Sequence, residues 1–302
     1  MIETTMNSGF AAIIGRPNAG KSTLMNKILG EKVAITSPKP QTTRNKILGI
    51  YTKEQYQIIF IDTPGMFPAG VGTAKTKLGE FMQRSAETAR SGVDCVILVA
   101  DVSRFDRELP EKMIKSNVPV ILALNKIDCI PNNEILPVIE KYRKYPFTAI
   151  IPISAKNGVN VDELLSVIKR YIPEGPRYYP SDLVTDQPEL LIISEIIREK
   201  ALRALQDEIP HGIAVMIQKV NKRDDKNIVD VEAEIYCEKE SHKGMIIGKN
   251  GEMLKRIGSM ARIEIEELFG SKANLQLWVR VKKDWRNVDY FVRNFGYDIK
   301  NI

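Results

Sequence analysis

The sequence predicts an α/β domain built on a mostly parallel sheet, followed by a smaller α+β domain. Short apolar runs alternate with polar, helix-forming stretches through the first half of the chain, which is the pattern of parallel strands joined by covering helices. That order changes after a proline-rich stretch. The length of 302 residues also exceeds one typical domain of roughly 100–200 residues. We therefore expect two packed units.

Five buried strands account for the apolar runs of the first unit. They lie at 10–14, 57–61, 95–100, 120–124 and 148–153. Prolines 173, 176, 180 and 188 then interrupt the chain. Proline lacks an N–H donor and restricts the residue before it, so this stretch continues neither a helix nor a central strand. We place the first domain at 1–172, a linker at 173–189 and the second domain at 190–302.

The second domain follows a different order of elements. A helix is expected at 190–208, two alternating strands at 213–219 and 227–237, a helix at 251–269 and a strand at 273–282. This order of helix, two strands, helix and strand predicts a small α+β domain.

Composition limits the classes of protein that fit. The chain is 43% hydrophobic and 27% charged, as ordinary globular domains are. Its three cysteines are far apart, which favours neither a disulfide framework nor a zinc site and fits a reducing cytoplasm. No apolar run approaches the ~20 residues of a membrane-spanning helix. Residues 239–300 hold 13 basic and 8 acidic side chains, so a local positive face is expected there.

The strongest chemical signal is a Gly-x-x-x-x-Gly-Lys-Ser loop between a strand and a helix. Its glycines let backbone N–H groups surround phosphates, and the helix N-terminus adds partial positive charge. Lys21 is expected to reach the β- and γ-phosphates, and Ser22 to bind Mg²⁺. The predicted phosphate loop is Gly15, Arg16, Pro17, Asn18, Ala19, Gly20, Lys21, Ser22 and Thr23.

A second signal is Asp-Thr-Pro-Gly at the end of the next apolar run. Asp62 is placed to hold Mg²⁺ through water, and Gly65 to offer its N–H to the γ-phosphate and serve as a hinge. Thr63 and Pro64 complete the motif. Such a turn is common alone, but it is specific when it follows a phosphate loop.

Two later motifs select the base. The carboxylate of Asp128 can accept both the N1–H and the 2-amino group of guanine, a donor pair that adenine lacks, so ATP should be rejected. Asn125 and the stem of Lys126 are expected to brace the ring. Ser154, Ala155 and Lys156 then complete the pocket with a backbone N–H to the guanine oxygen and a lysine stem across the other face.

In this order the four motifs resemble those of translation-factor-class small GTPases. Between the first two motifs, residues 35–44 resemble switch I of the Era family of ribosome-assembly GTPases, in which a threonine caps Mg²⁺ and the γ-phosphate. Spacing does not decide between Thr42 and Thr43, and a plain polar surface loop is the alternative. The predicted metal-binding residues are Ser22, Thr42, Thr43 and Asp62.

One departure bears on catalysis. Ras-like enzymes carry a glutamine after the second-motif glycine to orient water, whereas this chain has Met66. We therefore expect slow intrinsic turnover that a partner or a cation raises, with Lys21, Asn18 and Gly65 as the catalytic set. The loop resembles that of potassium-stimulated GTPases, where the residue at Asn18 binds K⁺, so K⁺ is a second candidate cofactor beside Mg²⁺.

The second domain contains a Gly-x-x-Gly loop flanked by lysines. The pattern is frequent by chance, but here it follows two strands and opens a helix, as in the nucleotide clamp of a KH domain. The predicted RNA-binding residues are Ile247, Gly248, Lys249, Asn250, Gly251, Lys255 and Arg256. The order of elements is similar to the type II KH arrangement. Trp285 could stack on a base, but we favour a place in the core.

A GTPase domain followed by a type II KH domain resembles the Era family over essentially the whole chain. The resemblance implies binding near the 3′ end of small-subunit ribosomal RNA during 30S assembly, by a cytoplasmic monomer that cycles between GTP and GDP. The sequence does not decide whether the protein also binds the membrane surface as a peripheral protein. The alternative is a signalling GTPase whose second domain docks a protein or a membrane-associated partner.

Overall fold

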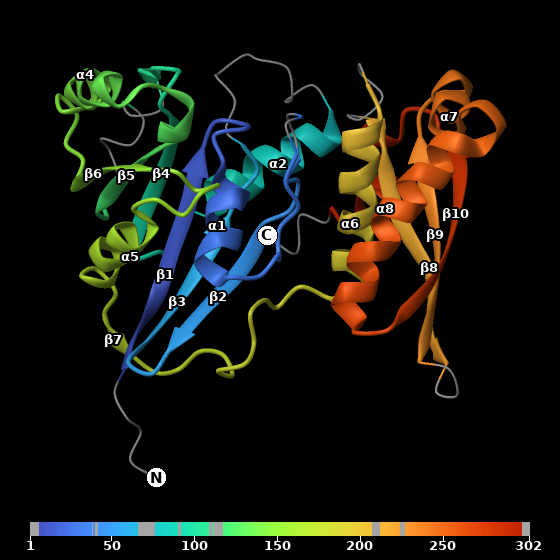
Figure 1. Ribbon diagram of the computed structural model, residues 1–302, viewed down its shortest axis with the longest axis horizontal. Helices are drawn as coiled ribbons and strands as arrows, with labels where there is room; N and C mark the ends of the chain where they lie inside the picture. Colours follow the sequence, from blue (N-terminus) through green and yellow to red (C-terminus); the bar gives the residue numbers. More distant parts are fainter. Residues whose placement is uncertain are drawn as a thin grey trace, which may run out of the picture.

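In the computed structural model the chain forms two domains side by side (Figure 1). The structure describes residues 6–37, 39, 42–65, 76–89, 92–108, 111, 117–206, 212–223 and 227–297. Within this part of the chain no helix is both long enough and apolar enough to cross a membrane.

The first domain is a twisted sheet with helices on both faces. Its strands follow the order β2-β3-β1-β4-β5-β6. All neighbours on this path run parallel except β2 and β3, which are antiparallel. The strands are β1 (Met6–Gly15), β2 (Ile47–Lys53), β3 (Tyr56–Asp62), β4 (Cys95–Asp101), β5 (Val120–Asn125) and β6 (Ala149–Ile153). The helices are α1 (Lys21–Leu29), α2 (Lys77–Thr88), α4 (Asn132–Tyr142) and α5 (Val161–Lys169).

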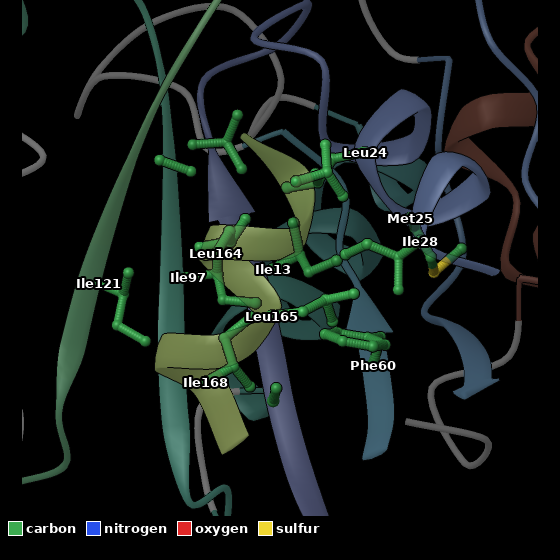
Figure 2. Close-up of a cluster of buried hydrophobic side chains, with 14 of the residues drawn as sticks. Ile13, Leu24, Met25, Ile28, Phe60, Ile97, Ile121, Leu164, Leu165 and Ile168 are labelled. Atoms are coloured by element: carbon green, nitrogen blue, oxygen red, sulfur yellow. The ribbon is translucent and has the colours of Figure 1, made fainter. Parts of the chain in front are cut away.

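The central strand β1 is buried on both faces, because successive side chains of a strand point in opposite directions. Ala11 and Ile13 pack into one core, shown in Figure 2, with Leu24 of α1 and Leu164 of α5. Ala12, which lies between them in the strand, points into a second core on the opposite face of the sheet. This two-sided burial explains why the strands read as continuous apolar runs.

The linker is packed against the first domain. Strand β7 (Glu174–Gly175) pairs antiparallel with the start of β1. Farther along, the Gln57 side chain accepts from the Tyr178 and Tyr179 backbone N–H groups, at 2.9 Å each. The first half of the linker is therefore bonded to the first domain along β1 and Gln57.

The second domain packs helices on one face of a three-stranded sheet of order β10-β9-β8. Its elements are α6 (Glu189–Ala204), β8 (Ala214–Arg223), β9 (Ile228–Cys237), α7 (Glu240–Ile247), α8 (Glu252–Phe269), β10 (Lys272–Val281) and α9 (Asp289–Asn294). In Figure 1, α6 and α8 lie between this sheet and the first domain. The expected order is present, with α7 and α9 as additional short helices.

Candidate functional site

A large cavity opens at the carboxyl ends of the parallel strands, where ligands bind in open α/β sheets. Its volume is about 1490 Å³. It gathers residues from all four nucleotide motifs and from switch I, and one residue of the second domain. Its lining includes Arg16, Pro17, Asn18, Ala19, Gly20, Lys21, Ser22, Thr23, Thr42, Thr43, Gly65, Asn125, Lys126, Asp128, Lys156 and Arg203.

The phosphate loop has the backbone that its glycines permit. Gly20, directly before α1, has φ 99°, and a Cβ there would lie 2.2 Å from the Asn125 side-chain nitrogen. The Lys21 ammonium donates to the carbonyls of Gly15 and Arg16 at 3.2 and 3.0 Å. Burial lowers the pKa of Lys21 to about 8, against the opposing effect of Asp62. An anion bound in the loop would raise this pKa and favour the charged form of Lys21 further.

Three oxygen-bearing side chains meet beside Lys21. Ser22 Oγ lies 2.8 Å from Thr43 Oγ1 and donates to Asp62 Oδ2 at 2.5 Å. The other Asp62 oxygen, Oδ1, is buried and has no hydrogen-bond partner among the described residues. Burial raises the pKa of Asp62 to about 6. These oxygens fit Mg²⁺, which prefers hard oxygen ligands and keeps several waters.

The two switch I threonines differ in direction. The Thr43 hydroxyl faces the oxygen cluster, whereas the Thr42 hydroxyl donates to the Lys39 carbonyl at 2.6 Å. Geometry therefore favours Thr43 as the residue that faces the metal position, a choice that spacing left open.

At the base end, Asn125 ties two loops together. Its amide nitrogen donates to the Ala19 carbonyl at 2.8 Å, and its oxygen accepts from the Ala155 N–H at 2.9 Å. The amide nitrogen of Asn125 therefore positions the phosphate loop, and its amide oxygen positions the Ser154–Lys156 loop. The Lys126 ammonium binds Asp101 at 2.6 Å.

Asp128 presents an exposed carboxylate to the cavity. One oxygen accepts from the Ser154 hydroxyl at 2.6 Å, and that bond lowers the pKa of Asp128. The carboxylate thus stays ionised and fixed in direction, as an acceptor for the two guanine donors must be.

Gly65 packs directly on the phosphate loop. A Cβ at Gly65 would lie 2.7 Å from both N and Cα of Pro17, so only glycine allows this approach. The adjacent Thr63 is buried and donates to the Ile13 carbonyl. Met66 lies outside the described residues. Arg16 points away from the loop and pairs with Asp106 at 2.6 Å and Glu108 at 2.9 Å.

Sequence reasoning missed the contacts that join switch I to the second domain. Arg44 is fully buried and donates to the Ile213 carbonyl at 2.7 Å and to the Tyr297 hydroxyl at 3.2 Å. Its guanidinium lies 5.8 Å from the Trp285 ring centroid. Arg44 directly follows Thr43 in the chain, so the segment that faces the oxygen cluster is also bonded to the second domain. No local motif marks such a contact.

Helix α6 holds the other side of switch I. Arg198 donates to the Thr42 carbonyl, and Arg203 donates to the Thr36 carbonyl at 3.0 Å. The fully buried Glu199 binds Arg203 and Lys32. Helix α2, which follows the second motif, packs its Leu78, Phe81 and Met82 against the end of the second domain.

The glycine loop of the second domain is exposed at the start of α8. Gly248 and Gly251 have φ of 75° and 79°, and Asn250 has φ 52°. A Cβ at Gly248 would lie 2.7 Å from the Met253 Cβ. Four of the predicted RNA-binding side chains are exposed, namely Lys249, Asn250, Lys255 and Arg256, whereas Ile247 packs on the core. Trp285 is fully buried and donates to the Gly212 carbonyl, so its expected place in the core is confirmed.

Known families match both domains. Residues 10–126 match the family of 50S ribosome-binding GTPases, and residues 208–286 match the KH domain. GTPase Era of Clostridioides difficile strain 630 is 52% identical over 97% of this chain and 99% of its own length. GTPase Era of Staphylococcus haemolyticus is 49% identical over 97% of this chain and 98% of its own. The chain belongs to the Era GTPase family.

Solved structures of Era match this chain over both domains. One, in complex with MgGDPNP and nucleotides 1506–1542 of 16S ribosomal RNA, matches with a TM-score of 0.92 and 41% identity over 97% of this chain and 100% of that one. Aquifex aeolicus Era bound to GDP.AlF4⁻ matches with a TM-score of 0.91 at the same identity and coverage. The predicted fold class, a P-loop GTPase domain followed by a KH domain, is confirmed, and the chain is a GTPase.

Proposed function

We propose that this chain is a GTP-hydrolysing switch that binds small-subunit ribosomal RNA near its 3′ end and acts in assembly of the 30S subunit. The observation that carries the proposal is the likeness to an RNA-bound Era, which spans both domains rather than the GTPase domain alone. The first domain holds the nucleotide, and the glycine loop of the second contacts RNA. The domain limits of 172 and 190 are part of this proposal.

In the nucleotide site, the phosphate-loop amides surround the phosphates, Lys21 neutralises them, and the Gly65 N–H meets the γ-phosphate. Asp128 accepts from the guanine N1–H and 2-amino groups, and the Lys156 stem covers one face of the base. The gathering of these residues in one cavity supports the assignment. Proposed contacts are Gly15, Arg16, Pro17, Asn18, Ala19, Gly20, Lys21, Ser22, Thr23, Asp62, Thr63, Pro64, Gly65, Asn125, Lys126, Asp128, Ser154, Ala155 and Lys156.

For the metal, we assign Ser22, Thr43 and Asp62 to Mg²⁺ and leave Thr42 out. The buried Asp62 Oδ1 without a partner among the described residues supports this choice, as does the Mg²⁺ nucleotide held by a solved Era. The ion supplies charge neutralisation at the phosphates. Asp62 acts through water, as a carboxylate at a strand end does in P-loop enzymes.

For K⁺, the candidate ligand is Asn18, whose exposed side chain lies at the rim of the nucleotide cavity. A cation there would supply the positive charge that an arginine finger gives in other GTPases. Turnover should then be faster in potassium than in sodium buffer at equal ionic strength. Equal rates would refute this assignment.

The RNA clamp is proposed to use Gly248 and Gly251 for close approach and Lys249, Lys255 and Arg256 for phosphate contacts. Replacing Lys249 and Asn250 by aspartate should abolish binding of a 16S 3′-end oligonucleotide and leave GTP affinity unchanged. Retained RNA affinity would favour the second candidate, a signalling GTPase that docks a protein or membrane-associated partner. A monomeric state remains a prediction that sedimentation can test.

A further inference from the structure

A second cavity, separate from the nucleotide cavity, lies between the two domains. Its volume is about 320 Å³, at the lower end of the range of small-molecule pockets. One wall is the segment from α1 to β2, namely residues 31–35, Asn45 and Ile47. The other wall comes from the end of the linker with α6 and from the last turns of α8, which face the first domain in Figure 1.

The interior of this interdomain cavity is mostly aliphatic. Ile35, Ile47 and Ile196 are buried at its floor, and Leu191 and Ile192 are half-buried along its side. A ligand with an apolar body would gain free energy by removing this surface from water.

The mouth of the cavity is acidic. Glu31 and Glu267 are exposed there, and neither has an ion-pair partner among the described residues. Lys32 does not neutralise them, because its ammonium binds the carboxylates of Glu199 and Glu264. Lys32 is the one basic residue among the described residues that line the cavity, so Glu31 and Glu267 leave its mouth with net negative charge.

Asn45 also lines the cavity, but its Oδ1 is buried and out of reach of a ligand there. The apolar interior and the acidic mouth together select an apolar ligand that carries positive charge and N–H donors.

We propose that the interdomain cavity binds a small amphipathic cation, an apolar body the size of a phenylalkyl group that carries one ammonium or guanidinium group. The apolar body occupies the floor of isoleucines. The cationic group donates to Glu31 or Glu267 at the mouth. Carboxylate ligands of the same shape are repelled, and neutral ones lack the charge-assisted bonds.

Such a ligand would contact both domains at once. Ile35 lines this cavity and the nucleotide cavity alike. We therefore expect ligand and nucleotide to be coupled through Ile35 at the start of switch I, and any effect of one on the affinity of the other must be reciprocal.

The test uses three probes that differ only in their polar group: 4-phenylbutylamine, 4-phenylbutanol and 4-phenylbutanoate. Binding to the full chain with GDP is followed through isoleucine methyl resonances. The amine should bind saturably, shift Ile35, Ile47 and Ile196 and leave Ile13 in place, with about tenfold weaker binding for the alcohol and none for the acid.

Matched variants assign the charge. The double variant Glu31→Gln, Glu267→Gln should weaken amine binding by at least about tenfold and bring it to the level of the alcohol. Glu252→Gln, on the same helix α8 but outside the cavity lining, should leave the affinity for the amine unchanged. Amine and alcohol of equal affinity, shifts away from the cavity, or full amine binding by the double variant would each overturn the proposal.

Discussion

Thr43 and Thr42 are neighbours with the same side chain and opposite environments. Thr43 faces Ser22 and Asp62, whereas Thr42 is turned onto the Lys39 carbonyl. Residue types and spacing could predict the phosphate loop, the base-selecting carboxylate and the oxygen ligands. They could not choose between two adjacent threonines, because that choice depends on how the loop between them and α1 is folded.

This difference predicts a matched pair of variants. Thr43→Ala should raise the Mg²⁺ concentration needed for half-maximal GTPase activity and lower turnover by about tenfold or more, because it removes an oxygen at the metal position. Thr42→Ala should change either quantity less than about twofold. Magnesium titrations of turnover measure both, and a larger defect in Thr42→Ala would reverse the assignment.

At the scale of elements, the KH glycine loop depends on its backbone. Gly248→Ala should destabilise the second domain by at least about 1–2 kcal/mol, because a side chain is strained at its φ of 75°. Gly244→Ala is the control: that glycine lies inside α7 with open space around it, so a gain of about 0.5–1 kcal/mol is expected. Denaturant unfolding of both variants measures the difference, and equal stabilities would contradict the account.

Continuously buried elements were predictable, whereas short elements and the half-buried edge strand β2 (Ile47–Lys53), which was not expected, were not. The five buried strands of the first domain and helix α8 stand near their expected positions, because long apolar periodicity reflects burial directly. Helix α7 has only eight residues and contains Gly244, so its periodicity is weak. Strand β7 lies inside the proline-rich linker and exists because β1 offers it an edge partner.

Arg44 connects the two domains at the scale of the whole molecule. It is adjacent to Thr43 in sequence and is bonded to Ile213 and Tyr297 of the other domain. Contacts that join residues 169 and 253 positions apart leave no local pattern, so no reading of the sequence could find them. They nevertheless join switch I directly to the second domain.

Arg44→Met should therefore uncouple the domains. We expect the ratio of RNA affinities with GTP analogue and with GDP to fall toward one, while GTP affinity changes less than about threefold, since Arg44 lies outside the cavity lining. Lys53→Met, exposed at the end of β2, is the control. Binding of a 16S 3′-end oligonucleotide in both nucleotide states measures the ratio, and a wild-type ratio in Arg44→Met would rule out this path.

The central claim is that the nucleotide controls the RNA contact. The direct measurement is the affinity of the full chain for an oligonucleotide of the 16S ribosomal RNA 3′ end, with Mg²⁺ and either GDPNP or GDP. Coupling between sites is typically worth 5- to 150-fold in affinity, so we expect binding at least about fivefold tighter with GDPNP. Equal affinity in the two nucleotide states would contradict the account.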